Sequence, residues 1–121
     1  MIVAGFGFRG AATVASLRDA LAQTDGPQPD AYAVPDDKAR TPAFVAFAAE
    51  TRTKVVPVTA NALQSVQTPT QAERVLEKRG TGSVAEACAL VAAGSKAALL
   101  TTRHISHDRM ATCALAIGDS T

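Results

Sequence analysis

The stretch that most constrains this chain lies at residues 80–94, which read GTGSVAEACALVAAG. Ser83 and Glu86 have the spacing of a capping box, in which the hydroxyl accepts from the N3 amide and the carboxylate accepts from the N-cap amide. From residue 84 to residue 93, Glu86 is the only strongly polar side chain. A helix that is apolar on every side is buried. The stretch therefore predicts a central core helix, and Gly94 predicts its end.

The loop that leads into this helix has a second interpretation. Gly80 and Gly82 permit a backbone path that other residues resist, and the first amides of a helix attract anions. A phosphate or carboxylate would then bind at residues 81–84. Because the Glu86 carboxylate competes for the same amides, the local chemistry favours a well-capped core helix over an anion site.

The chain begins with a strand, a glycine turn and a helix, a second layout in which backbone amides can hold an anion. Residues 2–8 are an apolar run typical of a buried strand, and residues 11–24 have the periodicity of an amphipathic helix. The spacing of Gly5, Gly7 and Gly10 is close to a dinucleotide-binding fingerprint. A glycine turn alone is weak evidence, however, and we expect no cofactor.

The rest of the chain alternates between strand and helix patterns. Further strands are expected at residues 31–35, 54–59, 96–102 and 110–117, and further helices at residues 42–51, 60–66 and 68–79. This alternation predicts a single α/β domain over residues 1–121, with a mostly parallel sheet flanked by helices. The last two strands predict a C-terminal antiparallel hairpin across the turn at 103–109, and Pro57 predicts either an edge position or a bulge for its strand.

Charge and composition exclude several classes of function. The formal net charge is +1, so no bulk attraction to nucleic acid or to a membrane is expected. The N-terminus lacks a basic region before its apolar run, so we expect no signal peptide and a cytoplasmic protein. Cys88 and Cys113 lie in apolar segments and are expected to be small buried hydrophobes.

Basic side chains fall at the predicted connections and predict a local binding site. If the first glycine turn and the final hairpin lie together, these residues line a rim suited to a ligand with several carboxylates or phosphates. Ordinary loop solvation is the alternative, and Arg9 has both interpretations: a carboxylate partner or a solvated turn arginine. The rim residues are Arg9, Lys38, Arg40, Arg103, His104, His107 and Arg109.

The sequence contains no complete catalytic or metal-binding set. His104 and His107 form an H-x-x-H pair without further ligands, so we expect no metal. Glu86 and His107 are weak candidates for a general base, and Asp108 beside His107 is a candidate acid–base pair. A capping role explains Ser83 better than a nucleophilic one, because no base for it is evident.

Three blocks of sequence resemble the CobE and CbiG C-terminal-domain family of cobalamin biosynthesis. The first is the Gly-Phe-Gly-Phe-Arg-Gly segment at residues 5–10, and Lys38 falls where the family has a lysine. The second lies between Gly80 and Leu90, and the third places Arg103 before an Ala-Thr-x-Ala-x-Ala strand. Residues 41–44 depart from the Glu-x-Gly-Leu that CbiG-like domains often show, which favours a CobE-type chain.

The resemblance implies an α/β domain of corrin-ring assembly that binds a polycarboxylate corrinoid or precorrin intermediate of the aerobic pathway. CbiG-type proteins open a lactone on a cobalt-precorrin with release of acetaldehyde, so a hydrolase with Glu86 or His107 as base is an alternative. A module that passes intermediates to other corrin-pathway enzymes is a third. The ligand-binding residues expected are Gly5, Gly7, Arg9, Gly10, Lys38, Thr81, Gly82, Ser83, Val84, Glu86 and Arg103.

Overall fold

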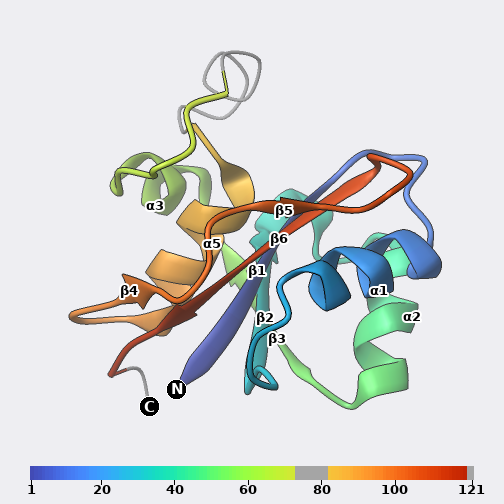
Figure 1. The fold of residues 1–121 in the computed structure, drawn as a ribbon, viewed down its shortest axis with the longest axis horizontal. Coiled ribbons are helices and arrows are strands. Elements are labelled where there is room, and N and C mark those ends of the chain that lie inside the picture. The colour runs from blue at the N-terminus through green and yellow to red at the C-terminus, as the bar shows by residue number, and fades with distance from the viewer. Residues whose placement is uncertain (73–81, 120–121) are drawn as a thin grey trace.

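The computed structural model describes residues 1–72 and 82–119, which form a mixed sheet covered by helices on both faces (Figure 1). The strand order is β3-β2-β1-β6-β4, and β5 also pairs with β6. Pairing is parallel from β1 to β2 and from β2 to β3, whereas β6 is antiparallel to each of its neighbours. The strands are β1 (Ile2–Phe8), β2 (Ala31–Pro35), β3 (Lys54–Val58), β4 (Ala98–Leu99), β5 (His104–Ile105) and β6 (Ala111–Ile117).

The α/β class and the C-terminal antiparallel hairpin are confirmed. Of the described strands, β6 alone runs against the others, so the sheet is mostly parallel in strand direction. β6 also separates β1 from β4, and β3 with its exposed Pro57 lies at the other edge as predicted. Because β6 is antiparallel to β5, a short turn joins the two strands, and the crossover connection that a parallel neighbour would require is not needed.

The strand expected over residues 96–102 is shorter than predicted and is divided in two. The amides of Leu100 and Thr101 both donate to the carbonyl of Leu115, at 2.8 and 3.2 Å, and the Thr101 hydroxyl accepts from the Leu115 amide. This pattern of two residues facing one is a β-bulge, which interrupts pairing and bends the strand. Pairing resumes as β5, inside the segment that the sequence pattern assigned to a turn.

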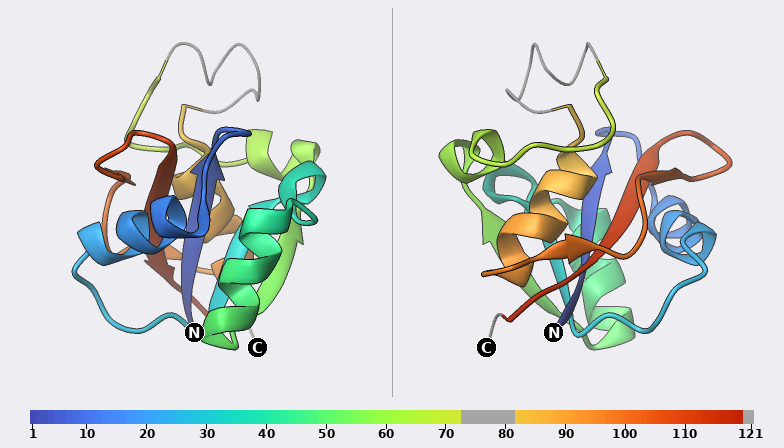
Figure 2. Two further views of the ribbon diagram at one scale, coloured as in Figure 1. Left: turned by 90° about the vertical axis from the view of Figure 1, so that its right-hand side faces the viewer. Right: turned by 60° about the vertical axis from the view of Figure 1, so that its left-hand side comes forward.

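Among the described residues, helices cover both faces of the sheet (Figure 2). α1 (Val14–Gln23) and α2 (Pro42–Thr51) pack on one face, and α3 (Ala60–Gln64) and α5 (Val84–Ala93) on the other. A short 3-10 turn, η1 (Asp36–Lys38), follows β2. The helix expected over residues 68–79 falls largely outside the described residues, and residues 68–72 are irregular. No helix in the described ranges has the length and apolar character needed to span a membrane.

Local sequence explains where the helices begin. Thr13 caps α1 in a full capping box with Ser16, which the sequence interpretation missed because a serine replaces the usual glutamate or glutamine. The helix predicted over residues 42–51 is observed as α2, with Thr41 at its N-cap and Pro42 in its first turn, although the threonine side chain makes no capping hydrogen bond. Thr59 caps α3 by accepting from the Ala62 amide.

The two faces of the sheet have different cores. The α1–α2 face is aromatic: the Phe6 ring meets the rings of Tyr32, Phe44 and Phe47 edge-on, with centroids 5.2, 5.8 and 5.5 Å away. The α5 face is built mainly from alanines, together with Cys88, Val3, Val58 and Leu63, and both cysteines are buried as expected. Small residues let the α5 backbone approach the sheet closely.

Gly5 shows how close that approach is. A Cβ atom added to Gly5 would lie 2.1 Å from the Ala85 carbonyl oxygen and 2.5 Å from the Ala89 nitrogen. Gly5 and Gly7 both lie inside β1, and the turn itself comes only at Arg9 and Gly10. The strand predicted over residues 2–8 is confirmed, and Gly5 within it makes room for a helix instead of forming part of the turn.

Candidate functional site

The end of β1 brings two of the predicted basic residues together. Arg9 is exposed and follows the last residue of the strand, and its amide donates to the Met110 carbonyl at 2.9 Å. Lys38, at the end of η1, places its ammonium 5.4 Å from the centre of the Phe8 ring. In open α/β sheets, ligands bind outside the carboxyl ends of the parallel strands. The two cations lie at such an end.

An aromatic ring supports the Lys38 cation. The half-buried Phe8 ring stacks on the buried Phe44 ring, with centroids 5.7 Å apart and planes 11° apart. A cation near an aromatic face is attracted by the ring quadrupole. Asp36 and Asp37 precede Lys38 in the same short turn, so this end of the sheet carries both signs of charge.

The start of α5 lies beside the same strand. A Cβ atom added to Gly7 would come within 3.3 Å of the Val84 Cβ atom. The Ser83 hydroxyl accepts from the Glu86 amide at 3.3 Å, which confirms Ser83 as the N-cap. The first glycine segment and the start of α5 therefore meet in space, as the predicted binding site requires.

The backbone around Gly82 is covered by another segment of the chain. The Ala72 amide donates to the Gly82 carbonyl at 2.9 Å, and a Cβ atom added to Gly82 would lie 2.4 Å from the Thr70 carbonyl oxygen. Gly82 and Ser83 are both buried. This packing favours the core-helix interpretation over an open anion site. Gly80 and Thr81 lie outside the described residues.

Glu86 does not complete the predicted capping box. Its side chain is fully buried, and its oxygens accept from Thr70 and from the backbone amide of Arg103. The capping-box prediction failed here because the carboxylate turns toward two neighbouring loops, whose contacts a local spacing rule does not include. This contact holds the Arg103 backbone at the start of α5, where Arg103 is half-buried.

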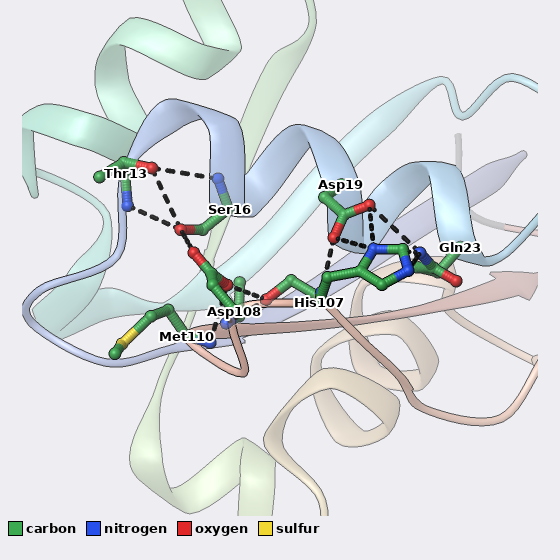
Figure 3. Close-up of polar contacts among 9 residues, drawn as sticks. Thr13, Ser16, Asp19, Gln23, His107, Asp108 and Met110 are labelled. Carbon is green, nitrogen blue, oxygen red and sulfur yellow. Dashed lines mark hydrogen bonds and ion pairs between the residues drawn. The ribbon is translucent and has the colours of Figure 1, made fainter.

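His107 lies on the turn between β5 and β6, where it binds α1 (Figure 3). Its amide donates to the Asp19 Oδ2 atom at 2.6 Å, and its Nδ1 atom lies 2.9 Å from the same oxygen. The ring is 83% exposed. The hydrogen bond from the His107 amide, helped by the Gln23 side chain, lowers the pKa of Asp19 below its ordinary value.

Asp108 binds a different part of the same region (Figure 3). Its carboxylate accepts from the Ser106 hydroxyl at 2.6 Å, the Ser16 hydroxyl at 2.5 Å and the Met110 amide at 3.1 Å. The Ser106 and Ser16 hydrogen bonds lower the pKa of Asp108. The described contacts of His107 and Asp108 thus connect the turn to α1 separately. The proposed acid–base pair is not formed by these contacts.

The H-x-x-H pair does not converge on one point. His104 places its Nδ1 atom 2.9 Å from the Thr102 carbonyl oxygen, whereas His107 contacts Asp19. Among residues 1–72 and 82–119, no group of three or more histidine, cysteine, aspartate or glutamate side chains is arranged to hold a metal ion.

Sequence reasoning found the candidates Glu86, His107 and Asp108 but missed the groups that bind them, which are Thr70, Asp19 and Ser16 respectively. Thr70, Asp19 and Ser16 come from segments in which nothing but the fold brings them to their partners. For the contact between Lys38 and Phe8, the sequence offered one signal. The first strand ends in the aromatic residue Phe8 directly before Arg9, which indicates an aromatic ring beside a cation at that end of the strand.

The comparison with protein families decides the relationship. The family described as "Cobalamin synthesis G C-terminus" matches residues 2–116. The chain belongs to this family. The resemblance drawn from the three sequence blocks is thereby confirmed, and the protein is a cobalamin biosynthesis protein with a CobE/CbiG-like fold.

Solved structures agree with this family. CobE, a protein from the cobalamin (vitamin B12) biosynthetic pathway, is 28% identical over 96% of this chain and 89% of its own, with a TM-score of 0.85. The cobalamin biosynthesis protein chiG from Agrobacterium tumefaciens str. C58 is 27% identical over 99% of this chain and 100% of its own, with a TM-score of 0.76.

A third structure extends the likeness in fold alone. The putative cobalamin biosynthesis protein G homolog from Sulfolobus solfataricus is 20% identical, with a TM-score of 0.71. It matches over 98% of this chain and 37% of its own, so the family's fold also occurs as part of a longer protein. A comparison with curated protein sequences gave no match.

Proposed function

We propose that this member of the CbiG C-terminal family binds a polycarboxylate corrinoid or precorrin intermediate at the carboxyl end of β1. The observation that carries the proposal is the placement of the Lys38 ammonium over Phe8, beside the exposed Arg9. A corrin intermediate offers an apolar ring with acid side chains around it. An aromatic surface next to two cations suits both parts of such a ligand.

Arg103 extends the proposed site toward α5. Its backbone is bonded to Glu86 in the first turn of that helix, and Val84 of the same turn packs near Gly7 of β1. Gly5, Gly82 and Ser83, which the sequence included among the ligand contacts, are buried and serve the packing of α5. We therefore assign ligand contact to Arg9, Lys38 and Arg103.

A lactone-opening hydrolase is less well supported. Both oxygens of Glu86 already accept hydrogen bonds inside the protein, and the side chain has no exposed surface. His107 is exposed, but its described contacts bind it to α1. A general base must lie within hydrogen-bonding distance of the proton that it removes, and these contacts occupy both candidates. We therefore propose a binding protein and not a hydrolase. We also propose that it works in the cytoplasm with other corrin-pathway enzymes.

Titration with a corrin acid tests the proposal. The probe is the acid obtained by hydrolysing the side-chain amides of vitamin B12, followed by visible absorption and by calorimetry. We expect binding that weakens with added salt, since charged contacts carry it. Lys38→Met and Arg9→Ala should each weaken binding about tenfold, the value of one hydrogen bond to a charged group.

Arg18→Ala is the matched control. Arg18 is an exposed arginine paired with Glu50 at 2.8 Å between α1 and α2, so its loss removes one positive charge away from the proposed site. The absence of both a spectral shift and heat at micromolar protein would overturn the proposal. Release of acetaldehyde from a lactone precorrin, detected by mass spectrometry, would favour the hydrolase, and retention of other pathway proteins without corrin binding would favour the interaction module.

A further inference from the structure

Glu86 is a fully buried carboxylate in the first turn of α5. Its Oε1 atom accepts from the Thr70 amide at 2.9 Å. Its Oε2 atom accepts from the Thr70 hydroxyl and from the Arg103 amide, both at 2.8 Å. Thr70 and Arg103 are separated from Glu86 by 16 and 17 positions in the sequence. One side chain therefore joins two distant segments to the helix that carries it.

The chemistry of these contacts requires a carboxylate. Thr70 and Arg103 each present backbone N–H donors, and an ionised carboxylate accepts at both oxygens. Glutamine has the same shape, but one of its two terminal atoms is an NH₂ donor, which would face another donor here. A capping role does not explain these contacts, because in a capping box the carboxylate would accept from the Ser83 amide.

These contacts join the segment of Arg103, one of the proposed ligand-binding cations, and the segment of Thr70 to the start of α5. Arg103 directly precedes β5, and its backbone amide donates to Glu86. This hydrogen bond fixes the backbone position from which the Arg103 side chain extends. Thr70 leads to Ala72, whose amide binds the Gly82 carbonyl at the start of α5. Loss of the carboxylate would free the Arg103 and Thr70 backbones together.

We propose that Glu86 is a positioning residue, which acts on the acid ligand through Arg103 and neither touches the ligand nor transfers a proton. The inference rests on the proposed function, since it assigns how one of the three ligand-binding cations is held. It replaces the catalytic role that the sequence suggested for Glu86 by a role in orientation.

A double-mutant cycle measures this coupling. The corrin acid from vitamin B12 is titrated into the wild type, Arg103→Ala, Glu86→Gln and the double variant. Each single change should weaken binding about tenfold, and the double variant should be no weaker than either, because both changes remove the same contact. Glu86→Gln combined with Lys38→Met should be additive, about a hundredfold.

Glu50→Gln is the matched control, since Glu50 is an exposed glutamate that pairs with Arg18 outside the site. It should bind the corrin acid like the wild type. Independent effects of Glu86→Gln and Arg103→Ala would overturn the inference while leaving the proposed function intact. A wild type that does not bind the corrin acid would instead overturn the proposed function, and the inference with it.

The amide signals of Thr70 and Arg103 give a readout without ligand. In ¹⁵N NMR spectra, Glu86→Gln should shift both signals and leave that of Gly10, at the other end of the site, in place. If Glu86→Gln does not fold, Thr70→Val removes only the hydroxyl contact and takes its place. A shifted Arg103 amide together with weaker corrin binding supports positioning by Glu86, and an unchanged amide and affinity overturn it.

Discussion

The Lys38 ammonium lies 5.4 Å from the centre of the Phe8 ring, at the point where β1 ends. The two residues come from different connections of the sheet, so their contact links the end of β1 to η1 after β2. It places a cation and an aromatic ring on one surface, and we expect each to depend on the other for ligand binding.

Phe8→Leu should therefore weaken corrin-acid binding and reduce the additional effect of Lys38→Met, because both changes remove the same contact. Cation–π contacts at exposed sites contribute about 0.5–1 kcal/mol, so a loss of two- to fivefold in affinity is expected by calorimetry. Phe8→Tyr keeps the ring and is the control. Additive effects of the Phe8 and Lys38 changes would show that the ring does not hold the cation.

Gly5→Ala should destabilise the fold strongly. Its Cβ atom would meet the backbone of α5 at the Ala85 oxygen and the Ala89 nitrogen, which cannot move like a flexible side chain. Overpacking of this kind costs about 1–3 kcal/mol or more, measured by urea denaturation. Gly10→Ala is the matched control, because a Cβ atom there meets nothing within 4 Å. Equal effects of the two changes would contradict the close approach of α5.

Tyr32→Phe should leave stability unchanged or raise it. The Tyr32 hydroxyl is buried and has no hydrogen-bond partner among the residues that the structure describes. The ring would keep its stacking on Phe47, with centroids 5.0 Å apart. An unsatisfied buried polar group costs about 1–3 kcal/mol, so denaturant unfolding should show a gain within that range. A clear loss of stability would mean that the hydroxyl is satisfied in solution.

Stability should fall in acid through Asp19 and Asp108. Hydrogen bonds from the His107 amide and from the Ser106 hydroxyl, respectively, lower their pKa values in the folded state below the ordinary value of 3.8. A lowered carboxylate pKa contributes stability above the unfolded value, and the contribution is lost as pH falls through the folded value. Asp19→Asn and Asp108→Asn should each flatten the decline in urea midpoint below about pH 4. If neither variant alters the pH dependence of stability, the hydrogen bonds of Asp19 and Asp108 between α1 and the turn at residues 106–110 are contradicted.

Sequence reasoning was most successful where a short pattern fixes its own structure. The apolar run of α5, its Ser83 cap and the Pro42 start of α2 were all read from neighbouring residues. It failed where a side chain has both local and distant partners within reach. Glu86 has the spacing of a capping box with Ser83, but its carboxylate binds Thr70 and Arg103 instead. Distances along the chain of 16 and 17 positions lie beyond any helix periodicity.

The sheet itself was predicted in class and not in order. Alternating patterns indicate parallel strands, but β6 pairs antiparallel with β1 along its whole length, from Phe8 opposite Ala111 to Ile2 opposite Ile117. In this position, β6 contributes buried residues to the cores on both faces of the sheet. The bulge at Leu100 and Thr101 depends on pairing with Leu115 and leaves no mark in composition. For the site, the cations Arg9, Lys38 and Arg103 were identified, whereas the Phe8 ring was not, and Glu86 was identified without its contact to Arg103.

The placement of β6 has a consequence for the order in which the sheet can form. Of the described strands, β4 and β5 pair with β6, and β6 joins them to β1. β1, β2 and β3 can pair with one another before β6 is made, but β4 and β5 enter the sheet only when β6 lies between them and β1. The strand that is latest in the chain is therefore inserted between segments that precede it.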